Sequence, residues 1–156
     1  MLKIIFLDFD GVMDTAYYDH VLNKMGLAGS DTFGTVFDPE CVRNLKYIID
    51  MTGADIVVSS SWKHFMTYKD LLDMWDARKL PGFVTDVTPT PNVRRCRGDE
   101  IDACLNECKD DCEYVIIDDM DGSNFNSHQL PRLIVVNPFN GLDHDSAERA
   151  VMLLKG

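Results

Sequence analysis

Short apolar runs alternate with amphipathic segments along this chain. Strands are predicted at 3–8, 56–59, 114–117 and 133–136, where short apolar runs have the length of a strand rather than a helix. Between the runs, apolar residues recur three and four positions apart, the spacing that lines one face of a helix. Fully apolar strands separated by helices are typical of a parallel sheet covered on both faces. The pattern therefore predicts an α/β fold, a Rossmann-like three-layer sandwich with a mostly parallel central sheet.

Local signals mark where the helices begin and end. Asp38 followed by Pro39 predicts a helix start, because an aspartate cap and a proline at the first helical position suit that place. Gly53 is typical of the residue that ends such a helix. Thr67 with Asp70 resembles a capping box and predicts the start of the next helix. Two further helices are expected from about Gly98 and about Asp145.

Two stretches lack a clear helical or strand period. Residues 12–37 contain several glycines and aromatic residues, which predicts a loop or a small flap over the end of the first strand. Residues 83–94 are β-like and rich in proline, which predicts a short strand and a loop. We expect residues 1–156 to form one domain that is capless or carries only a minimal flap, placed at about 12–37.

Charge and composition narrow the class of protein. The formal net charge is −11, so extended binding of nucleic acid is not expected, although a phosphorylated end remains compatible with the local cluster Arg94, Arg95 and Arg97. No apolar run approaches the length of a membrane span, and Met1-Leu2-Lys3 leads directly into the first strand without a signal-peptide pattern. The expectation is a cytoplasmic protein.

Five cysteines make an odd count, so reduced thiols are expected in that compartment. Cys104, Cys108 and Cys112 fall four residues apart, which predicts that they lie along one face of a helix. Paired Cys-x-x-Cys spacings or nearby histidines would indicate zinc, and this spacing is not of that kind. We expect these cysteines to be half-buried apolar residues.

Polar residues suited to chemistry follow three of the predicted strands. Asp8 and Asp10 end the first strand two residues apart, which places both carboxylates on one side of the backbone, and Gly11 then permits a sharp turn. A serine run, 59–61, ends the second strand, and Asp118-Asp119 ends a later one. In open α/β sheets, ligands bind at the carboxyl ends of the strands, so these groups are expected to share one crevice.

The residue types in that crevice suit phosphate and a hard cation. Mg²⁺ prefers oxygen ligands and is commonly bound by one or two carboxylates together with water and a substrate phosphate. A serine hydroxyl and the amides after it can hold phosphate oxygens, and an arginine presents a planar fork of donors to the same oxygens. The expected partner is thus a phosphorylated small-molecule or macromolecular substrate.

Four motifs in this order resemble those of the haloacid dehalogenase (HAD) superfamily of phosphatases. Asp8-Phe9-Asp10-Gly11 resembles its DxDG motif, and Ile56-Val57-Val58-Ser59 its second motif. Arg97 occupies the place of the basic third motif, where lysine is more common in the family, and Val115–Asp119 resembles the fourth. The strings Ser59-Ser60-Ser61-Trp62 and 137–142 resemble a small, capless HAD group that includes domains attached to RNA-repair proteins.

The resemblance implies a Mg²⁺-dependent phosphomonoester hydrolase that works through a covalent aspartyl-phosphate. Asp8 would be the nucleophile and Asp10 the general acid and base. Phosphate-binding residues would be Ser59, Ser60 and Arg97, with Arg94 or Arg95 as the alternative cation. The metal would be held by Asp8, Asp118 and Asp119 together with the backbone carbonyl of Asp10. The substrate would be a nucleotide, a nucleic-acid end or another bulky phosphomonoester.

Two other functions fit part of the pattern. A receiver-like switch accepts phosphate on an aspartate, but its acceptor lies on a middle strand, and Asp10 has no counterpart there. A metal-binding interaction domain would bind Mg²⁺ without turnover. Among neighbouring residues, Asp14, Asp121 and Asn124 are expected to be solvated loop residues, and Trp62 is expected to anchor the core.

Overall fold

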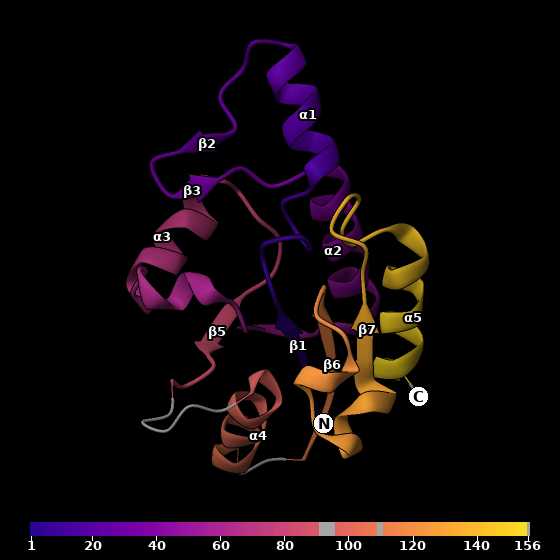
Figure 1. Cartoon of the computed structure of the whole chain (residues 1–156). Coiled ribbons are helices and arrows are strands. Elements are labelled where there is room, and N and C mark those ends of the chain that lie inside the picture. The colour runs from indigo at the N-terminus through magenta and orange to yellow at the C-terminus, as the bar shows by residue number, and fades with distance from the viewer. Residues whose placement is uncertain (91–95, 109–110, 156) are drawn as a thin grey trace.

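The computed structural model describes residues 1–90, 96–108 and 111–155. Its centre is a five-stranded sheet in the order β5-β4-β1-β6-β7 (Figure 1). Every neighbouring pair in this sheet is parallel, which confirms the predicted α/β, Rossmann-like fold. The strands are β1 (Leu2–Leu7), β4 (Asp55–Val58), β5 (Val84–Val87), β6 (Cys112–Asp118) and β7 (Leu133–Val135).

Helices cover both faces of the sheet because the central strands β1, β4 and β6 bury apolar residues on both sides. Helices α2 (Pro39–Thr52) and α5 (His144–Lys155) pack against each other and bury one face, which includes Ile5 and Leu7. Helix α4 (Arg97–Glu107) covers the other face, where Ile101 packs with a second cluster of buried residues. Helix α3 (Tyr68–Ala77) packs beside the edge strand β5.

The predicted helix caps form as expected. Asp38 precedes α2 and its carboxylate accepts from the amide of Glu40, and Gly53 ends the helix with a φ of 70°. Thr67 and Asp70 form the reciprocal capping box at the start of α3. These caps define where α2 and α3 begin and where α2 ends, so the chain can turn from α2 into β4.

The segment 12–37 is more ordered than its sequence indicates. It contains helix α1 (Ala16–Lys24) and the hairpin strands β2 (Ser30–Asp31) and β3 (Gly34–Thr35), which lie at the top of Figure 1, beyond the strand ends. Thr15 caps α1 by accepting a hydrogen bond from the amide of Tyr18. The helix escaped the sequence analysis because it has a single buried residue, Leu22, and therefore little apolar periodicity.

Cys104, Cys108 and Cys112 are half-buried as expected, but the prediction that they lie along one face of a helix is wrong. Helix α4 begins at Arg97 and ends at Glu107, so Cys104 lies in the helix, Cys108 follows it, and Cys112 begins β6. The three residues therefore do not share one helical face. None of the helices in the described ranges is long and apolar enough to cross a membrane.

Short 3₁₀ helices complete the connections. The first, η1 (Ser61–His64), follows β4, and two others, η2 (Gly122–Asn124) and η3 (Ser127–Arg132), lie between β6 and β7. Of the loop residues named above, Asp121 is exposed and caps η2, while Asn124 is half-buried beside it.

Candidate active site

The register of the central strands brings three polar positions to one edge of the sheet. Leu7 pairs with Val58 on one side and with Ile117 on the other. Asp8, Ser59 and Asp118 each come next in their chains, so all three stand at the same level of adjacent strands. The amide of Ser59 donates to the carbonyl of Leu7, which continues the ladder up to this edge.

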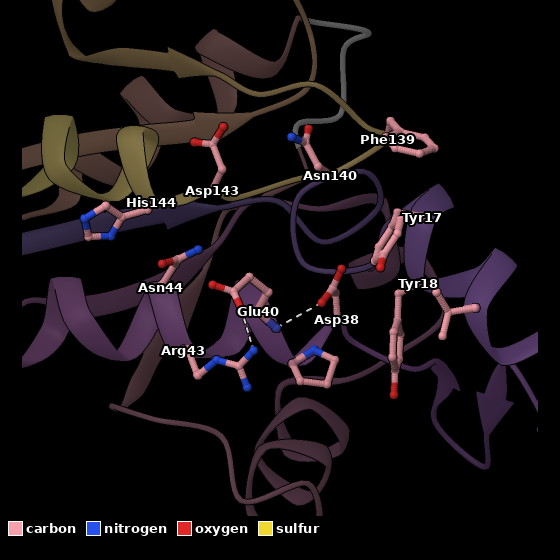
Figure 2. A pocket seen from close by; sticks show the side chains of 12 residues that line it. Tyr17, Tyr18, Asp38, Glu40, Arg43, Asn44, Phe139, Asn140, Asp143 and His144 are labelled. Carbon is pink, nitrogen blue, oxygen red and sulfur yellow. Dashed lines mark hydrogen bonds and ion pairs between the residues drawn. The ribbon is translucent and has the colours of Figure 1, made fainter.

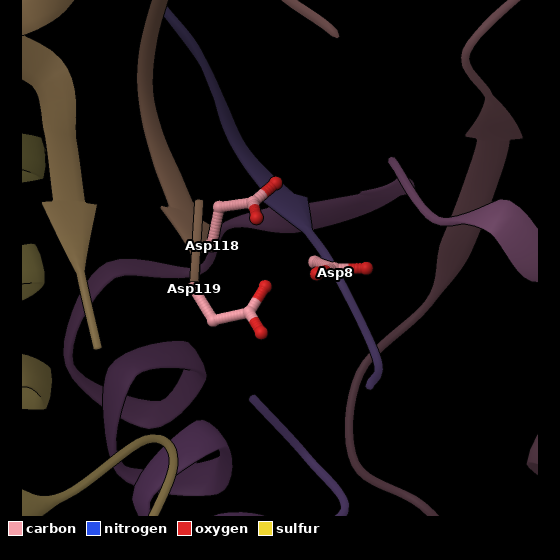
Figure 3. Close-up of side chains that lie close together, drawn as sticks. All are labelled: Asp8, Asp118 and Asp119. Carbon is pink, nitrogen blue, oxygen red and sulfur yellow. The ribbon is translucent and has the colours of Figure 1, made fainter. Parts of the chain in front are cut away.

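Carboxylates from β1 and β6 gather at that edge. Oxygens of Asp8, Asp118 and Asp119 all lie within 4.8 Å of one another (Figure 3). Asp8 and Asp118 are buried, and Asp119 is half-buried. Three oxygen-donor side chains this close together suit a hard divalent cation such as Mg²⁺. Because the three carboxylates repel one another, a bound cation would also relieve that repulsion.

Burial and charge raise the proton affinity of this cluster. Burial, and then the neighbouring charge of Asp118, raise the pKa of Asp8 to about 8. Burial is also the main cause of a raised pKa at Asp118, which the charge of Arg97 partly offsets. The cluster therefore holds more negative charge than its protein surroundings neutralise, and a cation would supply what is lacking.

Arg97 enters the site from the first turn of α4. Its Nη1 donates to the carbonyl of Ser59 at 2.7 Å and to Asp118 Oδ2 at 2.8 Å, and it lies 3.4 Å from Asp8 Oδ1. The third-motif candidate is thus within the carboxylate cluster. The alternatives Arg94 and Arg95 lie outside the described residues.

The two candidate phosphate-binding serines have different surroundings. Ser59 is buried, and its hydroxyl oxygen has no hydrogen-bond partner within residues 1–90, 96–108 and 111–155. Ser60 is also buried, but its hydroxyl already accepts from the amide of Trp62 and caps η1. An unpaired buried hydroxyl is unfavourable unless a ligand completes it, so Ser59 is better suited than Ser60 to bind a phosphate oxygen.

Asp10 stands apart from the carboxylate cluster. It is exposed, and its Oδ1 accepts a hydrogen bond of 2.9 Å from the indole Nε1 of Trp62. Trp62 is buried in the core, as predicted, yet it also contacts a candidate catalytic group, a role that the sequence did not indicate. The side chain of Asp10 is thus not part of the carboxylate group that could hold a metal.

Asp14 was expected to be a solvated loop residue, and that prediction is wrong. Its Oδ1 accepts from the amide of Gly11, and its Oδ2 is buried with no partner among the described residues. Burial, and then the adjacent side chain of Asp10, raise the pKa of Asp14 to about 8. The Asp-Gly-x-x-Asp spacing of a tight turn was the signal available for this contact.

Gly11 has a structural requirement at this turn. Its φ is 78°, and a Cβ added there would lie 2.5 Å from Asp119 Oδ2 and 3.0 Å from Pro138. Only glycine therefore lets the backbone leave Asp10 at this angle while Asp119 stays in the cluster.

Lys63 is a second buried cation near the site. It forms an ion pair with Glu100 of α4, and its Nζ also donates to the hydroxyl of Thr88 at 3.2 Å. The pair ties the first turns of α4, which carry Arg97, to the segment that follows β4. The sequence does not reveal this burial, because a lysine after a strand is usually exposed.

A cavity of about 600 Å³ opens on the far side of the loop 137–142 (Figure 2). The loop is held by hydrogen bonds from Ala16 to the carbonyl of Pro138 and from Leu142 to that of Val12. The cavity is lined by Tyr17, Tyr18, Val21, Asp38, Pro39, Glu40, Arg43, Asn44, Phe139, Asn140, Asp143 and His144. Because its lining omits the carboxylate cluster, we place the candidate active site at the strand ends and not in this cavity.

Comparison with known families agrees with this geometry. The profile of a family described as the HAD domain in Swiss Army Knife RNA repair proteins matches residues 4–147. The chain therefore belongs to that family, and it carries an HAD hydrolase-type domain. No curated protein and no solved structure matches the chain.

Proposed function

We propose that the protein is a Mg²⁺-dependent phosphomonoester hydrolase that forms a covalent aspartyl-phosphate. The observation that carries this proposal is the cluster of Asp8, Asp118 and Asp119 at the ends of two paired strands, with Arg97 in contact. Family membership supports hydrolase chemistry of this type. Bound Mg²⁺ would offset the repulsion between the carboxylates and an incoming phosphate and would polarise its oxygens.

Asp8 is the nucleophile in this proposal. One of its carboxylate oxygens attacks phosphorus, the bond from phosphorus to the leaving oxygen breaks, and an aspartyl-phosphate forms. Its Oδ1 accepts from the amide of Phe9 at 2.8 Å, which orients the carboxylate at the strand end. Arg97 neutralises negative charge on the nucleophile and on the transferring group.

Asp10 supplies and removes the protons. It donates a proton to the departing oxygen in the first step and takes a proton from the attacking water in the second, which releases inorganic phosphate and restores Asp8. Ser59 completes the site by donating its unpaired hydroxyl to a phosphate oxygen.

The proposed substrate is a nucleotide, a nucleic-acid end or another bulky phosphomonoester. The segment between Gly11 and α2 contributes one nine-residue helix and a hairpin of two-residue strands, which is a small cover for a crevice. The family description refers to RNA repair proteins, and that supports a phosphorylated nucleic-acid end. The net charge of −11 favours recognition of an end over an extended strand. A cytoplasmic site of action is part of the same proposal.

The test is a phosphatase assay with Mg²⁺ across p-nitrophenyl phosphate, nucleotides, sugar phosphates, phosphopeptides and 3′- or 5′-phosphorylated oligonucleotides. We expect multiple turnovers that stop on chelation and in the Asp8→Asn variant. Accumulation of one equivalent of acyl phosphate without turnover would indicate a receiver-like switch instead. Binding of Mg²⁺ with neither turnover nor acyl phosphate would indicate a metal-binding interaction domain.

A further inference from the structure

One contact in the site lies outside the proposed roles of the strand-end residues. Trp62 Nε1 donates to Asp10 Oδ1 at 2.9 Å, and Trp62 belongs to η1, 52 positions further along the chain. We propose that Trp62 is the positioning residue that holds the carboxyl of Asp10 for proton transfer, which rests on the hydrolase function proposed above.

The indole ring is fixed on several sides, so it can hold a mobile group. Trp62 is 3% exposed and packs edge-on against Phe9, with ring centroids 5.2 Å apart, and against Phe37 at 5.9 Å. Ser60 fixes its backbone by accepting from its amide. Asp10, in contrast, is exposed and follows the end of β1, so its own surroundings leave its carboxyl less constrained.

The hairpin β2-β3 packs against another edge of the Trp62 ring. A Cβ added at Gly34 would lie 3.2 Å from the far edge of the indole. Arg78 holds the hairpin there by donating twice to Asp31 and once to the carbonyl of Gly34, and its guanidinium lies 6.0 Å from the Trp62 ring centroid. The small flap and Asp10 are therefore joined through one rigid side chain.

The chemistry of the indole suits both half-reactions. An indole N–H only donates, so Oδ1 of Asp10 stays an acceptor whether the carboxyl is giving or taking a proton. The contact can therefore persist while the protonation state of Asp10 changes.

The chain contains a matched control in its other tryptophan. Trp75 is 5% exposed, lies in the same core cluster, and donates its Nε1 to the carbonyl of Pro81, also at 2.9 Å. Trp62→Phe and Trp75→Phe therefore remove the same group from similar surroundings, and only the first removes it from Asp10.

The experiment compares phenyl phosphate, a poor leaving group, with p-nitrophenyl phosphate, a good one. Because general acid–base catalysis contributes about 10²- to 10⁴-fold, Trp62→Phe should lower kcat on the poor substrate about tenfold more than on the good one. Trp75→Phe should leave the ratio of kcat on p-nitrophenyl phosphate to kcat on phenyl phosphate unchanged. When Asp10→Asn is already present, adding Trp62→Phe should not change this ratio further. Equal losses on both substrates, or a further change in that background, would overturn the proposal.

A second readout does not depend on turnover and separates this inference from the proposed function. The two indole N–H resonances are assigned by the two Trp→Phe variants, and their shifts are then followed in Asp10→Ala. The Trp62 resonance should move upfield while that of Trp75 stays in place. If the wild-type protein hydrolyses no phosphomonoester, the proposed function fails, whereas an unmoved Trp62 resonance in Asp10→Ala sinks the positioning role.

Discussion

Arg97 and Asp118 form a buried ion pair, with Nη1 lying 2.8 Å from Oδ2. Asp118 is fully buried, so its charge depends on this partner. Arg97→Ala should lower the free energy of unfolding by about 3–5 kcal/mol, the usual result of leaving one member of a buried pair uncompensated. Urea denaturation measures it, and the exposed pair variant Lys69→Ala should lose less than about 1 kcal/mol.

Arg97→Lys tests whether charge alone is enough. Nη1 of Arg97 makes all three contacts, to Ser59, Asp118 and Asp8, and a lysine ammonium keeps the charge but not the rigid planar group that places this nitrogen. We expect an intermediate stability and a lower kcat/KM than the wild type. Full activity in both Arg97 variants would show that another cation, such as Arg94 or Arg95, holds the phosphate.

The contact between Gly11 and Asp119 predicts a specific loss of metal affinity. Gly11→Ala would force its Cβ against Asp119 Oδ2 and move that carboxylate out of the cluster. Gly53→Ala is the matched control, because Gly53 also has a positive φ, 70°, and nothing lies within 4 Å of its added Cβ. Both variants should lose about 1–2 kcal/mol of stability from the left-handed backbone. Only Gly11→Ala should raise the Mg²⁺ concentration that gives half-maximal activity.

The adjacent serines should respond in opposite ways to truncation. Ser59→Ala removes a buried hydroxyl that has no partner in the part of the chain that the structure describes, so stability should change little. The transition-state stabilisation measured by kcat/KM should fall by about 2 kcal/mol, the value of a hydrogen bond to a charged group. Ser60→Ala removes the cap of η1 and should destabilise the protein by about 1 kcal/mol. Unfolding curves measure the loss of stability, and kinetics measure the loss of the phosphate contact. A Ser59→Ala enzyme with wild-type kcat/KM would exclude that contact.

The raised pKa values of Asp8 and Asp14, each about 8, predict how stability depends on pH without metal. Between about pH 4 and pH 8 the folded protein holds protons that the unfolded chain has released, so its stability falls as pH rises. The slope can reach about 1.4 kcal/mol per pH unit for each group. Urea denaturation in EDTA at pH 5, 6.5 and 8 measures this slope.

Magnesium should partly offset that fall in stability at high pH, because it binds the ionised carboxylates. At a Mg²⁺ concentration 5–10 times its Kd, mass action should raise the free energy of unfolding by about 1 kcal/mol at pH 8. This stabilisation should vanish near pH 5, where the carboxylates are protonated. Asp119→Asn, which removes one charge from the cluster, should weaken the effect. A Mg²⁺ effect of equal size at both pH values would argue against these carboxylates as its ligands.

The sequence predicted the parts of the fold that depend on local signals. Asp38, Gly53 and Thr67 mark helix ends through their own side chains or lack of one, so neighbouring residues suffice to predict them. The apolar runs predicted the strands, and the alternation with helices predicted their parallel pairing. Placing Asp8, Ser59 and Asp118 at strand ends then predicted that they meet, which the register of β1, β4 and β6 bears out.

The features that were missed depend on tertiary contacts. Trp62 was expected only in the core, since nothing in the segment 59–62 reveals that its N–H points back to Asp10. Asp14 and Lys63 are polar residues in loops, which are exposed by default, and only the packing of the chain around them shows their burial. Helix α1 has too few buried residues to leave a periodic pattern.

The strand order has a consequence for how the protein matures. Strand β1 lies between β4 and β6, and its pairing with β6 joins residues 110 positions apart, as in Leu2 with Cys112. A ribosome would therefore release Asp8 and Asp10 long before Asp118 and Asp119 could join them. Pairings so distant in the chain form slowly, so the nascent protein should show no activity until the segment 112–119 has emerged and β6 has paired with β1.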